Sequence, residues 1–178
     1  FGEMLTFQSI LAQEKNPAVR RALLSQKIED MINTVVRQTA FYRFEKAAHA
    51  ERQNGELSRK RLCEIWQNVQ SESLGKAFHF TKEYDPYWTY ITHFFHTPFY
   101  VYAYAFGDCL VNALYTVYQE SPDKADFVRK YTEMLKKGGT QTHKDMLSPF
   151  GLDARDKRFW LKGLKVLENF IDRLEQDV

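Results

Sequence analysis

The sequence contains few cysteines, no long apolar run and no large excess of either charge. Its two cysteines, Cys63 and Cys109, fall inside predicted helices, which favours buried thiols of a reducing compartment over a disulfide framework. Without a run of about 20 apolar residues we expect no membrane span, and we expect no signal peptide. The 25 basic and 23 acidic residues are spread along the chain, so we expect solvated helix faces and no nucleic-acid partner.

Motifs of the common catalytic sites are also missing. None of the five histidines occurs in a His-Glu-x-x-His pattern, which would place two imidazoles on one helical face with a base between them. The sequence has no glycine-rich phosphate loop, no paired cysteines and no serine-nucleophile motif. His93 and His96 lie three residues apart, but no carboxylate stands beside them and Pro98 follows too closely for a continuing helix. This pair alone therefore does not predict a metal site.

Apolar residues recur at steps of three and four along most of the chain, and no convincing strand pattern occurs. With 178 residues, 44% of them hydrophobic, the chain can bury a core. Caps, prolines and glycines divide the pattern into predicted helices at residues 1–13, 17–54, 58–75, 86–95, 98–120, 121–137, 142–147 and 153–177. We predict an all-α fold, an irregular multi-helix bundle, with residues 1–178 forming a single helical domain.

The longest predicted helix, at residues 17–54, has two apolar strips and a few polar residues in its second half. The first strip consists of Leu24, Ile28, Met31, Val35, Thr39 and Tyr42, and the second of Phe41, Phe44 and Ala48. Arg37 and Glu45 are interpreted as a buried ion pair that fixes packing. His49 follows Glu45 by four residues and can pair with it on the same face.

A tyrosine-rich stretch near the middle of the chain carries the candidate site. Thr97 and Pro98 predict a helix start, because threonine caps helices and proline suits the first helical position. In that helix Tyr100 and Tyr104 lie four residues apart and so share a face. Tyr102 has the spacing of a core aromatic residue.

Two histidines, His93 and His96, stand just before this predicted helix start. Imidazoles and phenols can donate hydrogen bonds to a substrate carbonyl or to a developing oxyanion. The same phenols could instead be buried and bonded to backbone carbonyls. The residues alone leave both interpretations open.

Several segments, in their order along the chain, resemble one family of helical enzymes. They are Phe1-Gly2-Glu3-Met4-Leu5; Thr34 to Thr39 followed by Phe44-Glu45; Gly55-Glu56-Leu57-Ser58 with Ile65-Trp66; Trp88 to Phe94 with Pro98 to Ala105; Leu135 to Gly139; and Gly151-Leu152-Asp153. Together they make the chain similar to the C-terminal part of the catalytic domain of an oligoendopeptidase F-like zinc metallopeptidase, in the thimet oligopeptidase clan.

The resemblance implies roles for individual residues. It places the His-Glu-x-x-His segment and a glutamate ligand upstream of Phe1, so zinc would belong to the intact enzyme and this chain would hold no zinc ligand. His93 or His96, and Tyr100 or Tyr104, are similar to the family's residues that bind the substrate carbonyl and stabilise the oxyanion. We take His93, Tyr100 and Tyr104 as the catalytic candidates and His96 and Tyr102 as the substrate-binding candidates, and which of the two histidines contacts the substrate stays open. Of the two tyrosines, Tyr104 matches the family's residue better than Tyr100 does. Glu3 would orient a zinc-ligating histidine by accepting a hydrogen bond from its other ring N–H.

As a whole, the resemblance implies a cytoplasmic peptidase that cleaves short peptides, with the missing N-terminal part of the same protein as a partner. The fragment alone is expected to be inactive. It is also expected to self-associate through apolar surface at residues 1–10 and 87–106. Two alternatives stay open: a stand-alone helical module that binds peptides or a partner helix, and a metal–carboxylate protein that uses His93, His96 and Glu45.

Overall fold

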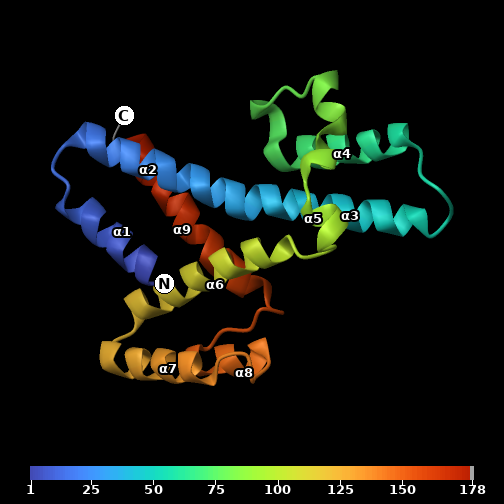
Figure 1. Cartoon of the computed structure of the whole chain (residues 1–178). Helices are drawn as coiled ribbons and strands as arrows, with labels where there is room; N and C mark the ends of the chain where they lie inside the picture. Colours follow the sequence, from blue (N-terminus) through green and yellow to red (C-terminus); the bar gives the residue numbers. More distant parts are fainter. Residues whose placement is uncertain (177–178) are drawn as a thin grey trace. The chain divides into compact units, whose positions relative to one another are not determined.

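The computed structural model describes residues 1–176, and within them the chain is helical and contains no strand (Figure 1). The α-helices are α1 (Gly2–Gln13), α2 (Pro17–Met31), α3 (Gln38–Arg52), α4 (Arg59–Leu74), α5 (His93–His96), α6 (Tyr102–Glu120), α7 (Lys124–Lys137), α8 (His143–Leu147) and α9 (Lys157–Gln176). A π-helical segment, η1 (Ile32–Arg37), joins α2 to α3, and 3₁₀ helices occur at η2 (Gly75–Ala77), η3 (Lys82–Tyr90) and η4 (Ser148–Phe150). The all-α prediction is confirmed.

The chain divides into two compact units. Unit 1 consists of Phe1–Glu29 and Gly107–Val178, of which residues 177 and 178, including the predicted end of the last helix, lie outside the described residues. Unit 2 consists of Asp30–Phe106. The single domain over residues 1–178 stays a prediction.

The core of unit 2 forms around Trp66, which is fully buried. Its ring lies 5.5 Å from that of Phe41, 5.4 Å from that of Phe44 and 5.6 Å from that of Tyr84. Ala40, Ile65, Val69, Ile91 and Val101 complete the buried cluster. Offset and edge-to-face ring pairs of this kind add to the stability that burial alone provides.

The segment η1 explains why the apolar strip of the long helix changes register. Leu24, Ile28, Met31 and Val35 are buried as predicted, but Thr39 is exposed and Ala40 is buried in its place. A π-helical turn contains about one residue more than an α-helical turn, so every later residue is displaced by one position. The prediction for Thr39 was therefore wrong, whereas Phe41, Phe44 and Ala48 are buried as expected.

Local end signals hold for α4. Ser58 caps the helix, its side chain accepting the N–H of Arg61 at 3.2 Å, and Gly75 ends it with a φ of 64°. A left-handed φ is open to glycine without steric cost, which is why the helix stops there.

The predicted helix over residues 86–95 is wrong in both bounds and type. The 3₁₀ helix η3 begins after Thr81, contains Pro86 in its interior and ends at Tyr90. In a 3₁₀ helix, residues three apart lie directly above one another. Tyr84, Tyr87 and Tyr90 therefore stack along one side, with ring centroids 5.1 Å and 5.5 Å apart.

The helix α6 begins at Tyr102 and not at Pro98, so the predicted start is also wrong. Phe99 has a φ of 61°, in the left-handed region that side chains other than glycine rarely adopt. A residue with that conformation cannot belong to a right-handed helix, so residues 97–101 form a turn between α5 and α6.

In unit 1, α6 and α9 approach each other closely at Gly163. A Cβ atom added at Gly163 would lie 2.8 Å from the carbonyl oxygen of Cys109 and 2.9 Å from its Cα. Phe159 and Phe170 of α9 are buried, while Leu164 is 38% exposed. Cys109 and, in unit 2, Cys63 are buried free thiols as predicted.

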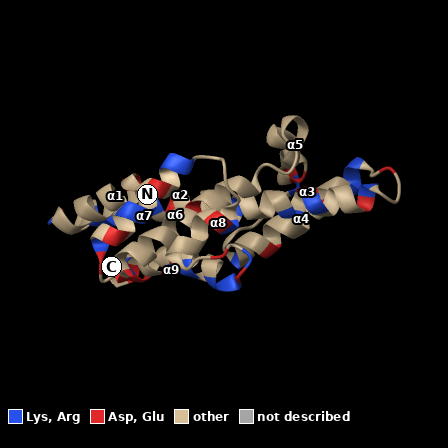
Figure 2. Ribbon diagram, turned by 90° about the horizontal axis from the view of Figure 1, so that it is seen from below, with Lys and Arg blue, Asp and Glu red and all other residues tan. Residues whose placement is uncertain are grey.

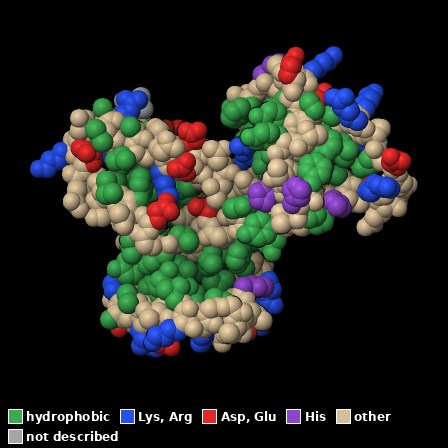
Figure 3. Space-filling model, viewed as in Figure 1, with side chains coloured by type: hydrophobic (Ala, Val, Ile, Leu, Met, Phe, Trp, Pro, Cys, Tyr) green, Lys and Arg blue, Asp and Glu red, His purple; other side chains and the backbone are tan. Residues whose placement is uncertain are grey.

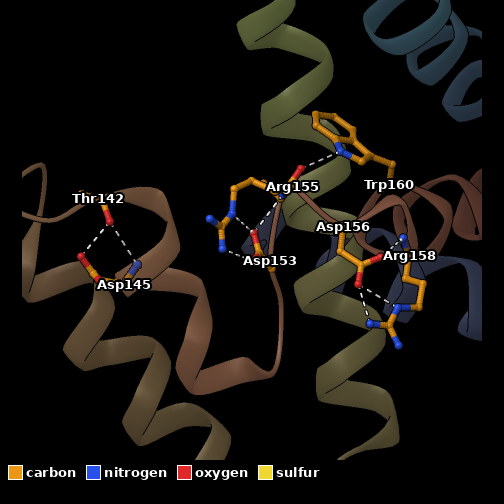
Figure 4. Close-up of polar contacts among 8 residues, drawn as sticks. Thr142, Asp145, Asp153, Arg155, Asp156, Arg158 and Trp160 are labelled. Atoms are coloured by element: carbon orange, nitrogen blue, oxygen red, sulfur yellow. Dashed lines mark hydrogen bonds and ion pairs between the residues drawn. The ribbon is translucent and has the colours of Figure 1, made fainter.

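Aspartate and threonine side chains determine where the last helices begin. Thr142 caps α8 by accepting the N–H of Asp145, and Asp123, not Ser121, caps α7 by accepting the N–H of Asp126. Figure 4 shows the turn before α9, where Asp153 bonds Arg155.

Two more contacts of this turn fix the start of α9. Asp156 bonds Arg158, and the indole of Trp160 donates to the carbonyl of Ala154 at 2.9 Å. Side-chain turns of this kind compete with a helix, which is why α9 begins at Lys157 and not at the predicted Asp153.

Lys and Arg residues and Asp and Glu residues are interspersed along the helices, as the blue and red segments of the ribbon in Figure 2 show. Among the described residues, no helix combines the length and apolar character that crossing a membrane requires.

Candidate functional site

Three of the predicted site residues meet in unit 2. We call His93, Tyr100 and Tyr104 the histidine–tyrosine cluster. The Nε2 atom of His93 lies 3.2 Å from the hydroxyl oxygen of Tyr104, within hydrogen-bond distance. The ring of Tyr100 lies parallel to the imidazole, with centroids 6.1 Å apart and planes 5° apart, and perpendicular to the ring of Tyr104 at 5.6 Å.

The cluster is open to solvent and so to a ligand. Tyr100 is 50% exposed and Tyr104 39% exposed, while His93 is partly buried. Figure 3 shows histidine side chains beside hydrophobic side chains on the face near α3 and α5. The alternative of buried phenols bonded to backbone carbonyls does not fit these exposures.

The cluster comes together by a route other than the predicted shared helix face. His93 begins α5, and Tyr104 lies in the first turn of α6. Tyr100 belongs to the turn between the two helices, and Phe99 just before it has a left-handed φ of 61°. A left-handed conformation costs a residue other than glycine about 1–2 kcal/mol, so other contacts must hold this turn.

Glu45 of α3 is the residue that bonds the turn. Its Oε1 atom accepts the backbone N–H of Phe99 at 2.8 Å, and the residue as a whole is only 2% exposed. The ring of Phe99 lies 4.7 Å from that of His49 and 6.4 Å from that of Tyr42, so α3 contacts both the backbone and the side chain of this residue.

Burial raises the pKa of Glu45 above its ordinary value. The bond from the Phe99 N–H, His49 and His93 act in the opposite direction, because each favours the ionised carboxylate. The predicted ion pair between Glu45 and Arg37 is wrong, since Arg37 instead lies with its guanidinium 5.2 Å from the Phe41 ring centroid. Sequence reasoning missed the role of Glu45, although a lone carboxylate between Phe44 and Ala48 on a buried strip was a usable signal.

The other two predicted contacts of a substrate lie at the edge of this region. Tyr102 is 53% exposed and packs its ring 5.9 Å from that of Tyr42, so its assignment to the core was wrong. His96 ends α5 and is exposed. Their roles in substrate binding stay predictions.

Glu3 belongs to unit 1 and is bonded to Lys27 of α2 at 2.6 Å. That bond is the main reason that the pKa of Glu3 is lowered. Burial raises the pKa of Asp108 of α6, while Lys27 lowers this pKa and Glu3 raises it. The role of Glu3 behind a metal ligand stays a prediction.

A metal centre made by this chain finds no support in the geometry. Among residues 1–176, no group of three or more His, Cys, Asp or Glu side chains could hold a metal ion together. Glu45 in particular binds a backbone N–H, so the alternative of a metal site from His93, His96 and Glu45 does not fit.

Comparison with known proteins assigns the chain a family. The family model described as peptidase family M3 matches residues 1–166. The chain is 28% identical over 176 residues to oligopeptidase PepF of Bacillus subtilis, covering 98% of this chain and 26% of that protein. It is 30% identical over 156 residues to an oligoendopeptidase F homolog of Borreliella burgdorferi, covering 87% of this chain and 26% of the relative.

Two solved structures share the fold. A putative peptidase from Chlamydophila abortus superposes with a TM-score of 0.89 at 26% identity, covering 99% of this chain and 29% of that one. The oligoendopeptidase-F from Enterococcus faecium superposes with a TM-score of 0.86 at 24% identity, covering 96% and 32%. The chain thus spans about a quarter of the length of the curated relatives that it matches.

Proposed function

The chain belongs to peptidase family M3, and on that premise we propose that it is part of a zinc-dependent oligoendopeptidase that hydrolyses short peptides. In this proposal it forms the C-terminal part of the catalytic domain of a cytoplasmic enzyme. It supplies groups that bind the substrate and stabilise the oxyanion, and the rest of the same protein supplies the remainder of the site.

The observation that supports this role most directly is the convergence of two hydrogen-bonding groups at one point. His93 Nε2 and the Tyr104 hydroxyl lie 3.2 Å apart, and an oxygen placed beside both could accept from each. Because Tyr104 and Tyr100 are exposed, a peptide carbonyl can reach them. Donors that are already in place when charge develops on that oxygen lower the barrier without reorganisation.

Zinc enters the proposal only through the intact enzyme. The described residues offer no set of ligands, so the metal would be held by residues that this chain does not contain. When bound, zinc would supply the Lewis acidity that the hydrolysis requires. His93, Tyr100 and Tyr104 would orient the peptide and share the charge on its carbonyl oxygen.

Tyr104→Phe in the full-length protein tests the proposal. Removing one oxyanion donor typically lowers kcat by about 10²–10³-fold, so we expect a loss of that size on a quenched fluorescent peptide, with KM little changed. Tyr90→Phe removes the same atom from a tyrosine that is 72% exposed and lies outside the cluster, and should leave kcat unchanged. Wild-type kcat for Tyr104→Phe would refute the proposed role.

The 178-residue chain by itself should not cleave peptides, and robust turnover that a chelator abolishes would contradict this.

The 178-residue chain should also self-associate. In unit 1 the partly buried rings of Phe1 and Tyr131 lie 4.7 Å apart, and Leu135 and Ile10 are 59% and 50% exposed. Exposed apolar surface of this kind favours association. Sedimentation equilibrium at several concentrations measures it, and a monomer at the highest would count against it.

A further inference from the structure

Glu45 holds the turn from which the histidine–tyrosine cluster is built, and we propose that it is a positioning residue for peptide hydrolysis. Its carboxylate bonds the backbone of Phe99, and through that backbone it acts on His93 and Tyr104, the two groups assigned to the substrate. The inference rests on the proposed function, because the geometry that it maintains is that of the same cluster.

Phe99 needs an external partner. Its φ of 61° suits glycine or asparagine, and phenylalanine has no side-chain polar group with which to stabilise the conformation. The carboxylate of Glu45, 54 positions earlier in the chain, provides a charge-assisted hydrogen bond of 2.8 Å to the N–H of this residue. His49 and Tyr42 of the same helical run then contact the ring.

The turn determines where the cluster residues lie. Tyr100 directly follows Phe99, and α6, with Tyr104 in its first turn, begins two residues after Tyr100. If Phe99 returned to an ordinary negative φ, the chain between α5 and α6 would change direction. The contact of 3.2 Å between His93 and Tyr104 and the parallel rings of His93 and Tyr100 both span this turn, so both depend on it.

The chemistry of Glu45 indicates more than core packing. Its Oε2 atom is buried and has no hydrogen-bond partner among the described residues. A buried carboxylate with one oxygen unsatisfied costs stability relative to an apolar side chain of similar size. The titratable groups that act on it are His49 on its own helix and His93 on α5, both of which favour the ionised form of Glu45.

Glu45→Gln in the full-length peptidase is the primary test. Glutamine keeps the shape and an acceptor oxygen but loses the charge, and Glu45→Ala removes the bond entirely. We expect kcat to fall about 5-fold for glutamine and about 10- to 100-fold for alanine, with KM within about 2-fold, because misplaced groups weaken the transition state. Glu51→Gln, a carboxylate on the same helix that bonds Arg61, is the matched control and should leave both constants unchanged.

A double-mutant cycle with Tyr104→Phe separates positioning from general destabilisation. If Glu45 acts through Tyr104, then Glu45→Gln should lower kcat in the wild-type background and much less in the Tyr104→Phe background. The same fold loss in both backgrounds, or wild-type kcat for Glu45→Gln, overturns the inference. If Glu45→Ala does not fold, as judged by circular dichroism, the glutamine variant decides alone.

The two proposals fail in different ways. Wild-type kcat for Tyr104→Phe refutes the proposed function, and with it the need to position the cluster. An impaired Tyr104→Phe together with an unimpaired Glu45→Gln refutes only the positioning role.

Discussion

Gly163→Ala should destabilise the protein, although alanine is the better helix former. A Cβ atom at this position would lie 2.8 Å from the backbone oxygen of Cys109, 2.9 Å from its Cα and 3.1 Å from its Cβ. Backbone atoms cannot rotate away as a flexible side chain can, so α9 and α6 must move apart. Overpacking of a tight interface costs about 1–3 kcal/mol, and the propensity of alanine returns up to about 1 kcal/mol. We expect a net loss of roughly 1–2 kcal/mol.

Gly107→Ala is the matched comparison within the same unit. Gly107 also lies in an α-helix, and apart from its chain neighbours and the nearby backbone of its own helix, no heavy atom of the described residues would lie within 4 Å of an added Cβ. Only helix propensity operates at this position, so this variant should be more stable by about 0.5–1 kcal/mol.

Urea unfolding followed by far-ultraviolet circular dichroism measures both variants. With a slope of about 2 kcal/mol per molar urea, the midpoint should fall by about 0.5–1 M for Gly163→Ala and rise by about 0.3–0.5 M for Gly107→Ala. A rise for both variants would refute the close helix approach. Equal falls would show that the loss at Gly163 has a cause other than the contact with Cys109.

Three further predictions concern buried groups. Trp66→Ala should cost about 3–5 kcal/mol in urea unfolding, because it empties the centre of the unit 2 core; a loss below about 1 kcal/mol would contradict that packing. The pKa of Glu45 is raised on folding, so the protonated carboxyl stabilises the wild-type protein at low pH, and this contribution is lost as pH rises through the pKa of the folded state. Glutamine does not titrate, so the stability of Glu45→Gln relative to wild type should increase as pH rises from about 4 to about 8. Curves of stability against pH that run parallel for the two proteins would contradict this. Burial raises the pKa of the Cys109 thiol to about 11, so it should react with iodoacetamide at about pH 8 only after unfolding; rapid labelling of the native protein would contradict this.

The sequence predicts most of the helices because their signals are local. Ser58, Gly75, Gly138 and Thr142 all act through neighbours within four residues, and each ends or begins a helix where expected. The register of the long helix could not be predicted beyond Val35, because the pattern argument assumes about 3.6 residues per turn and η1 departs from that value.

The start of α6 was mispredicted because a distant contact overrides a local preference. Thr97 and Pro98 carry the signals of a cap and a first helical residue, but the bond between Glu45 and Phe99 fixes the backbone in a turn instead. That bond joins residues 54 positions apart, so a prediction from neighbouring residues alone could not include it.

The residues of the candidate cluster were predicted from the sequence, but the elements that bring them together were not. His93, Tyr100 and Tyr104 do come together, but from two helices and a turn rather than from one helix face. Tyr102 was assigned to the core because it lies at the spacing of a buried helix face. It is instead the first residue of α6 and is exposed.

The π-helical turn makes the length of the segment Ile32–Arg37 as important as its composition. Deleting one residue there would allow an unbroken α-helix, and every later side chain of α3 would rotate by about 100° around the helix axis. Glu45 would then face away from Phe99 even though no residue of the cluster had changed. A homologue shorter by one residue at this point would need a different anchor for the same tyrosines.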